Sequence, residues 1–403
     1  MQKNKHPSRK THTPAAPDQD DALTQSLVTL SAGLARHIER TELPEPVKRK
    51  KADLLRLVRK CLQQKKDDVL DEALERLQDD DSNGYHYLKN KLEEASENAV
   101  FRRDGGPDLE VDAFVIPLFA RTAGGLRREQ CFQDEKAFEQ LRNSLIDAQL
   151  ESRHAKLVLV SHAYHLDEID RIGYSQLHGM VREAFDAMTR KKVTDAPEIA
   201  RSISGWPENR FAPEDSAVEL RFLLGFSLKA LDDPFYRVPD NEAAADRYFA
   251  ARAARFRQWA QQYAPLVKRC LVRDGREIEI DFLYQDLFYG GKETALAEYF
   301  TLQMMADMQH ALQEHGLAPE DAQAVLGPAH DAGETVLRVN LYAQGNDTPL
   351  VSSDKPLGSD GDLRAETDDA CDALATLGIQ SVALATKFDA DGRPVDVRPY
   401  RPA

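Results

Sequence analysis

One run of nine residues decides the fold class: Val111-Asp112-Ala113-Phe114-Val115-Ile116-Pro117-Leu118-Phe119. It is apolar at almost every position and rich in branched and aromatic side chains, which is typical of a strand buried on both faces of a sheet. The preceding residues 22–100 have a different pattern, because leucine and alanine recur there at spacings of three and four. That spacing predicts amphipathic helices. The sequence therefore predicts an α+β protein with a helical N-terminal segment.

The helical segment contains its own boundary signals. Pro44 and Pro46 separate a first helix from a second, and Ser82 or Asn83 is expected to cap a later one by accepting free backbone N–H groups. The basic run Lys48 to Lys51 falls on the first turn of a helix, where the helix dipole disfavours cations. Either solvent or an acidic partner must offset this charge. We expect the apolar stripe of these helices to be buried on the rest of the chain or on another copy.

The pattern of the sheet-forming region occurs a second time. Ile280 to Phe288 aligns without a gap on Val111 to Phe119, with an aspartate and a Leu-Phe pair in common, and a glycine pair, a helix and a strand follow each run. We therefore predict two similar α/β lobes, with an internal duplication as the hypothesis behind their likeness. The predicted organisation is a disordered arm (1–21), a helical segment (22–103), a first lobe (104–240), a connecting helix (241–270) and a second lobe (271–403).

The order of these elements resembles an uncharacterised group of beta-proteobacterial proteins of about this length that carry a domain of unknown function. The likeness lies in the strand Val111 to Phe119, the segment Glu279 to Tyr289, and the closing stretch Leu337-Arg338-Val339-Asn340-Leu341 to Lys355-Pro356-Leu357-Gly358. The resemblance implies a bacterial cytosolic protein and supplies no activity. That group tends to have a cysteine pair near its C-terminus, whereas this chain has none after Cys371, so no metal role carries over.

Composition narrows the range of partners. Lys and Arg number 53 and Asp and Glu 68, so the net charge is −15 at pH 7. This balance argues against a protein that coats nucleic acid, because such proteins gain affinity by neutralising phosphates. The basic start of the N-terminal arm is the exception, since basic tails can bind nucleic acid. No apolar run is long enough to span a membrane, and the N-terminus has no apolar signal-peptide core. We expect a cytoplasmic protein with no membrane partner.

Cysteine usage agrees with that compartment. The chain has four cysteines, Cys61, Cys131, Cys270 and Cys371, and no two of them are close enough for a CxxC motif. This spacing argues against a disulfide framework and a zinc ribbon. We expect free, buried thiols and predict no cofactor and no metal. A nucleophilic role for Cys131 would need a nearby base, which the sequence does not show.

Two glycine turns are candidate anion sites. A strand, a Gly-Gly turn and a helix N-terminus expose backbone N–H groups that can hold a phosphate or carboxylate. The candidate residues combine both turns with the basic side chains beside them: Gly124, Gly125, Arg127, Arg128, Gly290, Gly291 and Lys292. The second turn is not a P-loop, because Glu293 follows the lysine where Ser or Thr is required. Glycines that only permit tight turns are the alternative.

A second candidate follows a predicted strand. Ser161 to Glu168 contains His162 and His165, which we consider as acid–base residues because active sites of open α/β sheets collect at strand ends. Solvent-facing histidines at a helix start are the alternative. The sequence favours a non-catalytic binding or regulatory protein, with homo-oligomerisation and a small anionic ligand as options. The competing hypothesis is an enzyme that binds a phosphorylated or acidic small molecule at the glycine turns, in a cleft between the lobes.

Overall fold

The computed structural model describes most of the chain: residues 19–37, 44–122, 135–189, 218–233, 237–271, 278–283, 287–331, 334–357 and 362–400. Residue contacts divide the chain into two units. One consists of Met1–Ser96 and Gly173–Gly179, and the other of Glu97–Ile172 and Met180–Ala403. The predicted arm lies outside the described residues, except for its last three. The predicted lobe boundaries at 104–240, 241–270 and 271–403 stay a prediction.

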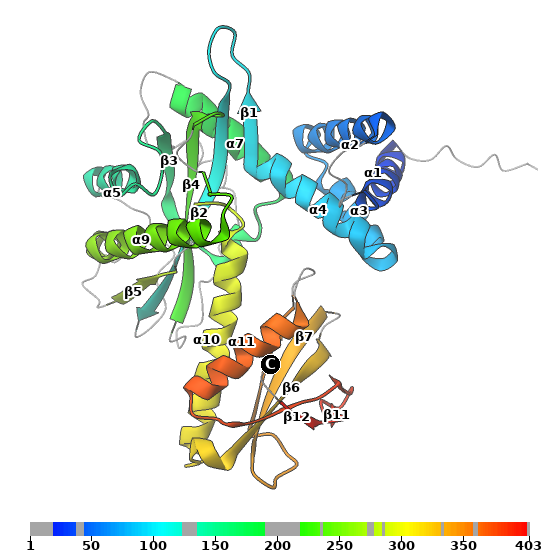
Figure 1. Ribbon diagram of the computed structural model, residues 1–403, viewed down its shortest axis with the longest axis vertical. Helices are drawn as coiled ribbons and strands as arrows, with labels where there is room; N and C mark the ends of the chain where they lie inside the picture. Colours follow the sequence, from blue (N-terminus) through cyan, green and yellow to red (C-terminus); the bar gives the residue numbers. More distant parts are fainter. Residues whose placement is uncertain are drawn as a thin grey trace, which may run out of the picture. The chain divides into compact units, whose positions relative to one another are not determined.

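The first unit is helical, as the leucine spacing predicted (Figure 1). Its helices are α1 (Gln19–Ala35), α2 (Glu45–Gln64), α3 (Asp67–Asp80) and α4 (Ser82–Glu97). They bury one apolar stripe each in a common core, which includes Leu27, Leu54, Val58, Leu70 and Leu88. The helical prediction was wrong only at its end. Residues 98–101 form the strand β1 (Asn98–Phe101), because they pair with a neighbouring strand.

The cap of α4 also differs from the prediction. Asp81, rather than Ser82 or Asn83, accepts the backbone N–H of Gly84 through its Oδ1, at 3.1 Å. Asp81 has an extended backbone and is the residue at which α3 ends, so one aspartate closes one helix and opens the next. The Ser82 hydroxyl bonds instead to the His86 ring at 3.2 Å.

The strand Val111 to Phe119 is confirmed and lies in the interior of a five-stranded antiparallel sheet. The strands are β1, β2 (Leu109–Thr122), β3 (Lys156–His165), β4 (Val218–Ala230) and β5 (Ile278–Phe282). Along its whole length β2 pairs with β4, and on its other edge β1 and β5 pair with its opposite ends. Between them, the Val115 N–H donates to the Phe288 carbonyl at 3.3 Å. One edge of β2 is therefore paired from Leu109 to Arg121, and the other edge is paired at both ends and bonded to Phe288 between them.

Helices α5 (Glu135–Asp147) and α9 (Glu242–Leu271) cover one face of this sheet. Phe114, Ile116 and Leu118 alternate along β2 and contribute to the core that these helices complete. The indole N–H of Trp259 donates to the Ser144 hydroxyl at 2.7 Å, which joins α9 to α5. Two further helices, α6 (Leu166–Ile169) and α7 (Tyr174–Thr189), follow β3.

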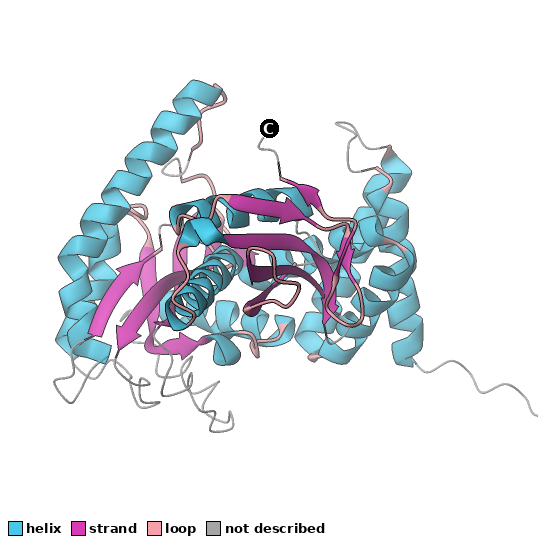
Figure 2. Ribbon diagram, turned by 90° about the horizontal axis from the view of Figure 1, so that it is seen from below, coloured by secondary structure: helices cyan, strands magenta, loops and turns pink. Residues whose placement is uncertain are grey.

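A second five-stranded sheet has the order β12-β9-β6-β7-β8. Figure 2 shows the strands of the structure in magenta and the helices that pack on them in cyan. Its strands are β6 (Ala322–Asp331), β7 (Glu334–Ala343), β8 (Val351–Pro356), β9 (Ser381–Leu384) and β12 (Arg398–Pro399). A short hairpin, β10 (Lys387–Phe388) and β11 (Pro394–Val395), precedes β12, and a 3-10 turn, η1 (Pro319–Asp321), precedes β6. Helices α10 (Gly291–Glu314) and α11 (Leu363–Thr376) supply its core. Since α10 also contacts β2 and β4 of the first sheet, this helix packs against both sheets.

The internal duplication is not confirmed. β5, which begins the predicted second copy, pairs with β2, which holds the first, through Leu118↔Phe282 to Thr122↔Ile278. The two aligned stretches are therefore neighbours in one sheet. The strand that follows each predicted helix belongs to a different sheet, β3 in one case and β7 in the other.

Close packing on β4 leads to a first prediction. A Cβ added to Gly225 would lie 2.7 Å from Leu159 Cδ2 and would also meet the Phe114 ring. We expect Gly225→Ala to lower the free energy of unfolding by about 1–3 kcal/mol, because the core must shift to admit the methyl group. Gly179→Ala is the matched control: its Cβ would meet open space within helix α7, so we expect a gain of up to about 1 kcal/mol. Urea unfolding of both variants checks this, and equal effects would contradict it.

Candidate functional site

The two histidines considered as acid–base residues lie at the end of β3. The pairing of β3 with β4 shifts register between Leu159 and Ala163, so His162 lies in a β-bulge. Bulges re-aim side chains and are frequent beside active sites. The His162 Nε2 lies 2.9 Å from Glu168 Oε2, and the same oxygen accepts the backbone N–H of His165 at 2.9 Å. The structure therefore joins His162 to Glu168, and His165 takes part in this contact through its backbone.

A buried ion pair on β4 supports this histidine–carboxylate contact. Arg221 lies opposite His165, is 2% exposed, and donates to Glu219 at 2.5 Å. Burial by itself raises the pKa of Glu168, but the hydrogen bond and charge of His162, the His165 N–H and the charge of Arg221 outweigh it. The pKa of Glu168 is therefore lowered, and the carboxylate stays ionised. A fixed carboxylate that orients an imidazole is the arrangement that acid–base catalysis uses.

The second glycine turn forms the start of α10. The N–H groups of residues 291–293 donate to the carbonyls of residues 288–290, at 3.0 to 3.4 Å. Lys292 Nζ lies 3.6 Å from Asp170 Oδ1 and 5.4 Å from the centre of the Tyr289 ring. The N–H donors of this turn and its ammonium group thus have partners within the chain. An anion bound here would have to compete with Asp170, and the predicted anion site stays a prediction.

The other predicted site residues fall outside the described part of the chain. These are Gly124, Gly125, Arg127 and Arg128, together with Cys131.

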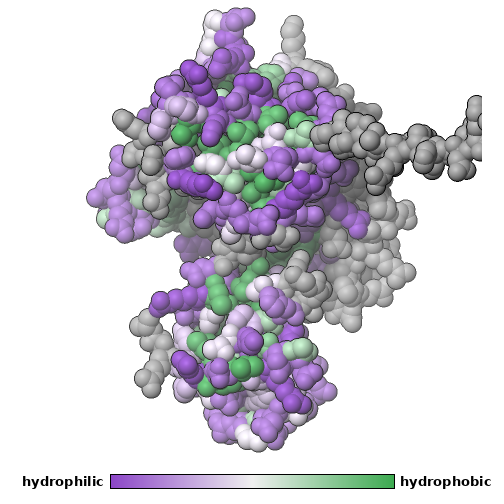
Figure 3. Space-filling model, turned by 90° about the vertical axis from the view of Figure 1, so that its right-hand side faces the viewer, coloured by the Kyte–Doolittle hydropathy of each residue, from purple (hydrophilic) through white to green (hydrophobic). Residues whose placement is uncertain are grey.

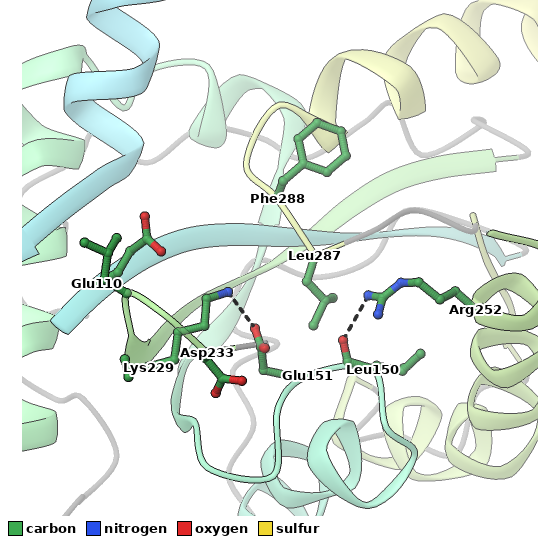
Figure 4. Close-up of a pocket in the computed structure, with 10 residues that line it drawn as sticks. Glu110, Leu150, Glu151, Lys229, Asp233, Arg252, Leu287 and Phe288 are labelled. Carbon is green, nitrogen blue, oxygen red and sulfur yellow. Dashed lines mark hydrogen bonds and ion pairs between the residues drawn. The ribbon is translucent and has the colours of Figure 1, made fainter. Parts of the chain in front are cut away.

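A cavity of about 520 Å³ lies at the opposite end of β4, where β2 begins (Figure 4). Its lining combines charged and apolar side chains: Glu110, Leu150, Glu151, Lys229, Ala230, Leu231, Asp233, Arg252, Leu287 and Phe288. Register explains the charged part, because Glu110 and Lys229 lie opposite each other on β2 and β4. The loop after α5 supplies Glu151, and α9 supplies Arg252. These charged lining residues were not predicted from the sequence.

The cations of the cavity are already engaged. Lys229 Nζ lies 3.1 Å from Asp112 and 3.7 Å from Glu151. Arg252 is 3% exposed and donates to the Leu150 carbonyl at 3.2 Å. Figure 4 shows the Lys229 ammonium group directed toward Glu151 and the Arg252 guanidinium group directed toward the Leu150 carbonyl. The carboxylates are engaged as well, because Ser152 donates its N–H to Glu151 at 2.7 Å and its hydroxyl to Asp233 at 2.6 Å. Three carboxylates and two cations line the cavity, so its lining is acidic.

The carboxylates of the cavity perturb one another. Burial, followed by the charge of Asp112, raises the pKa of Glu110, although the side-chain amide of Asn98 donates to it at 2.6 Å. Burial by itself lowers the pKa of Lys229, but Glu151, Asp112 and Glu110 together outweigh it, so the pKa is raised. Carboxylate charge contributes to both shifts, after burial in the case of Glu110 and against burial in the case of Lys229.

Apolar side chains complete the cavity. Leu287 points toward Glu151 and Leu150, whereas Phe288 points away from them (Figure 4). Phe288 and Leu231 are 46% and 48% exposed, so the cavity has apolar side chains at its open side. A sequence signal existed, since Glu110 and Asp112 share one face of a strand that is otherwise apolar. Its meaning depended on Lys229, more than a hundred residues away.

A second cavity, of about 560 Å³, lies in the C-terminal sheet. It opens where β6 and β9, which are parallel, lie beside the start of α11. The Tyr400 hydroxyl donates to Asp368 at 2.9 Å at its edge. The site has an apolar lining, in which Leu326, Pro328 and Leu384 take part.

Cys61 and Cys371 are free and buried, as predicted. Burial raises the pKa of both thiols, that of Cys371 to about 11. Among the described residues, no three His, Cys, Asp or Glu side chains come together as a metal-binding group. Within the same residues, no helix combines the length and the apolar character needed to cross a bilayer.

Comparison with known proteins assigns the chain to a family but indicates no activity. A family model described as a protein of unknown function, DUF2863, matches residues 13–381. The chain belongs to this family. The match confirms the expected domain of unknown function. No curated protein and no solved structure matches the chain.

The lowered pKa of Glu168 generates a second prediction. A carboxylate with a lowered pKa stabilises the fold above its unfolded-state pKa, and this contribution is lost as the pH falls through its folded-state pKa. We expect Glu168→Gln to cost about 2 kcal/mol at pH 7, the size of a charge-assisted hydrogen bond, and progressively less in acid. Urea unfolding at a series of pH values measures the difference, with exposed Asp186→Asn as the control for charge. A cost that does not change with pH would contradict the assignment.

Proposed function

We propose that the protein is a non-catalytic binding protein whose first sheet holds a small amphipathic cation. The cavity between the start of β2 and the end of β4 carries this proposal. Its lining has three carboxylates (Glu110, Glu151, Asp233) and two cations (Lys229, Arg252), a formal charge of −1. Asp112, which pairs with Lys229, adds a further negative charge beside the cavity. A positively charged ligand would offset this excess.

The pKa shift of Glu110 supports a cationic ligand. Burial, followed by the charge of Asp112, raises the pKa of Glu110, so its ionised form is destabilised at this position. A protonated amine beside Glu110 would stabilise the ionised form and would form strong, charge-assisted hydrogen bonds. An anion would meet the opposite situation, because the Lys229 ammonium group is already shared by Asp112 and Glu151.

The apolar side chains set the other half of the ligand. Leu150 and Leu287 line the cavity, and Leu231 and Phe288 are its exposed apolar members. Ligand sites in proteins combine such apolar walls with a few placed polar groups. An alkyl or aryl amine fits both parts. The free thiols of Cys61 and Cys371 agree with a reducing compartment, so we place this role in a bacterial cytoplasm.

An enzyme acting on a phosphorylated or acidic small molecule is the second candidate. The observation that favours it is the 2.9 Å contact between His162 and Glu168 in a β-bulge. The Lys292–Asp170 pair at the glycine turn weakens it, since the anion would have to displace a carboxylate. We therefore rank it below the binding protein.

Our third prediction is that amines bind this cavity, and a thermal-shift and calorimetry screen tests it. The panel pairs each amine with its neutral alcohol and its carboxylic acid, for example 2-phenylethylamine, 2-phenylethanol and phenylacetate. We expect stabilisation by amines alone, worth about 2.7 kcal/mol at 100 times the dissociation constant. Stabilisation by acids that Lys292→Glu abolishes would favour the enzyme instead. No stabilisation by any amine would refute the cation site.

Variants locate the binding. We expect Glu110→Gln and Asp233→Asn each to weaken amine binding roughly tenfold, the value of one charge-assisted hydrogen bond. Asp246→Asn makes the same charge change on an exposed position of α9 and should have no effect. Equal losses in all three variants would indicate a general charge effect rather than this cavity.

The pH dependence is a fourth prediction. The ionised form of Glu110 attracts a cation, and its pKa lies above the ordinary value for glutamate. Amine affinity should therefore rise as the pH increases through that folded-state pKa, with proton release on binding. Calorimetry in buffers of different ionisation enthalpy measures the released protons. The Glu110→Gln variant should release none.

A further inference from the structure

Two consecutive helices of the first unit carry opposite charges. Helix α2 has seven Lys or Arg and two Asp or Glu, whereas α3 has seven Asp or Glu and one Arg. Two lysines, Lys65 and Lys66, join them. This separation is unusual in a chain whose charges are otherwise mixed, and it gives one unit a basic surface beside an acidic one.

The basic residues of α2 form a row on its outer side. Arg49, Arg56 and Lys60 are exposed and recur at spacings of seven and four, so they share one face. That face lies opposite Leu54 and Val58, which are fully buried. The row extends about 16 Å along the helix at 1.5 Å per residue. Arg56 pairs with Asp53 on its own helix, with 77% of the Arg56 side chain exposed, and such a pair contributes little.

The acidic residues of α3 form a matching row. Asp68, Asp71 and Glu75 are exposed at spacings of three and four. Partial burial, followed by the charges of Asp67, Asp68 and Glu75, raises the pKa of Asp71. The charges of these acidic neighbours add to the effect of burial, so the row concentrates negative charge.

Other cationic side chains of this unit are already paired with carboxylates. Lys66 bonds to Asp20, and Arg76 bonds to Glu72 and Asp21, so these cations are already paired. Helix α1 packs against both α2 and α3. The two outward rows remain exposed, and the weak Arg56–Asp53 pair within α2 leaves them charged.

We propose that a second copy of this chain covers these rows, with α2 of each copy against α3 of the other. A two-fold axis makes both contacts at once, because each copy supplies one basic and one acidic row. The contact is self-complementary in charge, which fixes its register and speeds association.

Other occupants fit the surface less well. A nucleic acid would meet the α2 row but would be repelled by the adjacent α3 row and by a chain of net charge −15. An apolar partner would leave the charges of both rows unpaired, although the face in Figure 3 also carries hydrophobic residues among the hydrophilic ones. The second copy is the partner whose charge pattern is known to match.

The size of the surface sets the expected strength. Helices of 20 and 14 residues, each about 10 Å wide, offer roughly 500 Å² per copy. This lies below the roughly 800 Å² per partner of standard interfaces. The dimer should therefore be weak and sensitive to salt, because exposed charges are screened over about 10 Å at 0.1 M.

Analytical ultracentrifugation of the full chain tests the proposal. At 20 mM salt we expect concentration-dependent dimers, with a dissociation constant that rises at least tenfold on addition of 500 mM sodium chloride. A monomer at all concentrations in 20 mM salt overturns the proposal. If that monomer binds a labelled single-stranded oligonucleotide through the α2 row, nucleic acid replaces the second copy as the partner.

Charge reversal identifies the surfaces. The triple variants Arg49→Glu/Arg56→Glu/Lys60→Glu and Asp68→Lys/Asp71→Lys/Glu75→Lys should each be monomeric. An equal mixture of the two should form a heterodimer, which also shows that both variants are folded. The control, Arg247→Glu/Arg257→Glu/Lys387→Glu, reverses exposed charges elsewhere and should dimerise like the wild type. Dimers that persist in both test variants, or a mixture that stays monomeric, refute the α2–α3 contact.

Discussion

Backbone hydrogen bonding of β2 is the constraint on which the first sheet depends. This strand is apolar along most of its length and has neighbours on both edges, so each of its polar backbone groups needs a partner away from water. β4 supplies partners along one edge, from Leu109↔Ala230 to Arg121↔Val218. On the other edge, β1 and β5 each cover one end, and the Phe288 carbonyl serves the middle. Segments distant in sequence are thereby drawn to one strand.

The same pairing creates the candidate ligand cavity. The register of β2 with β4 sets Glu110 opposite Lys229, and the ammonium group also attracts Asp112 and Glu151. A one-residue slip would turn these charges to the opposite face of the sheet. The cluster therefore depends on the same hydrogen bonds as the core. An excess of carboxylates around one ammonium group is costly for folding alone, and it is the kind of local imbalance that a bound cation relieves.

Helix α10 connects the packing of the two sheets, as β2 connects the strands of the first sheet. Its beginning follows the segment bonded to β2, and its later turns place Met304, Met308 and Leu312 in the core of the second sheet. Tyr299 lies between these parts, and burial, followed by the charges of Glu219 and Asp307, raises its pKa. One helix thus takes part in the packing of both sheets.

Local pattern accounts for what the sequence determined. The leucine spacing predicted α1 to α4, and the apolar run predicted β2, because helix and strand periodicities depend on residues close in the chain. The buried Cys61 and Cys371 and the family level of the resemblance were also accessible in this way. Tertiary structure alone decided that the two similar strands share one sheet, that Glu168 orients His162, and that Lys229 joins the carboxylates of β2. These outcomes depend on strand register and on a β-bulge, and register is fixed by packing between segments a hundred residues apart, which no local pattern records.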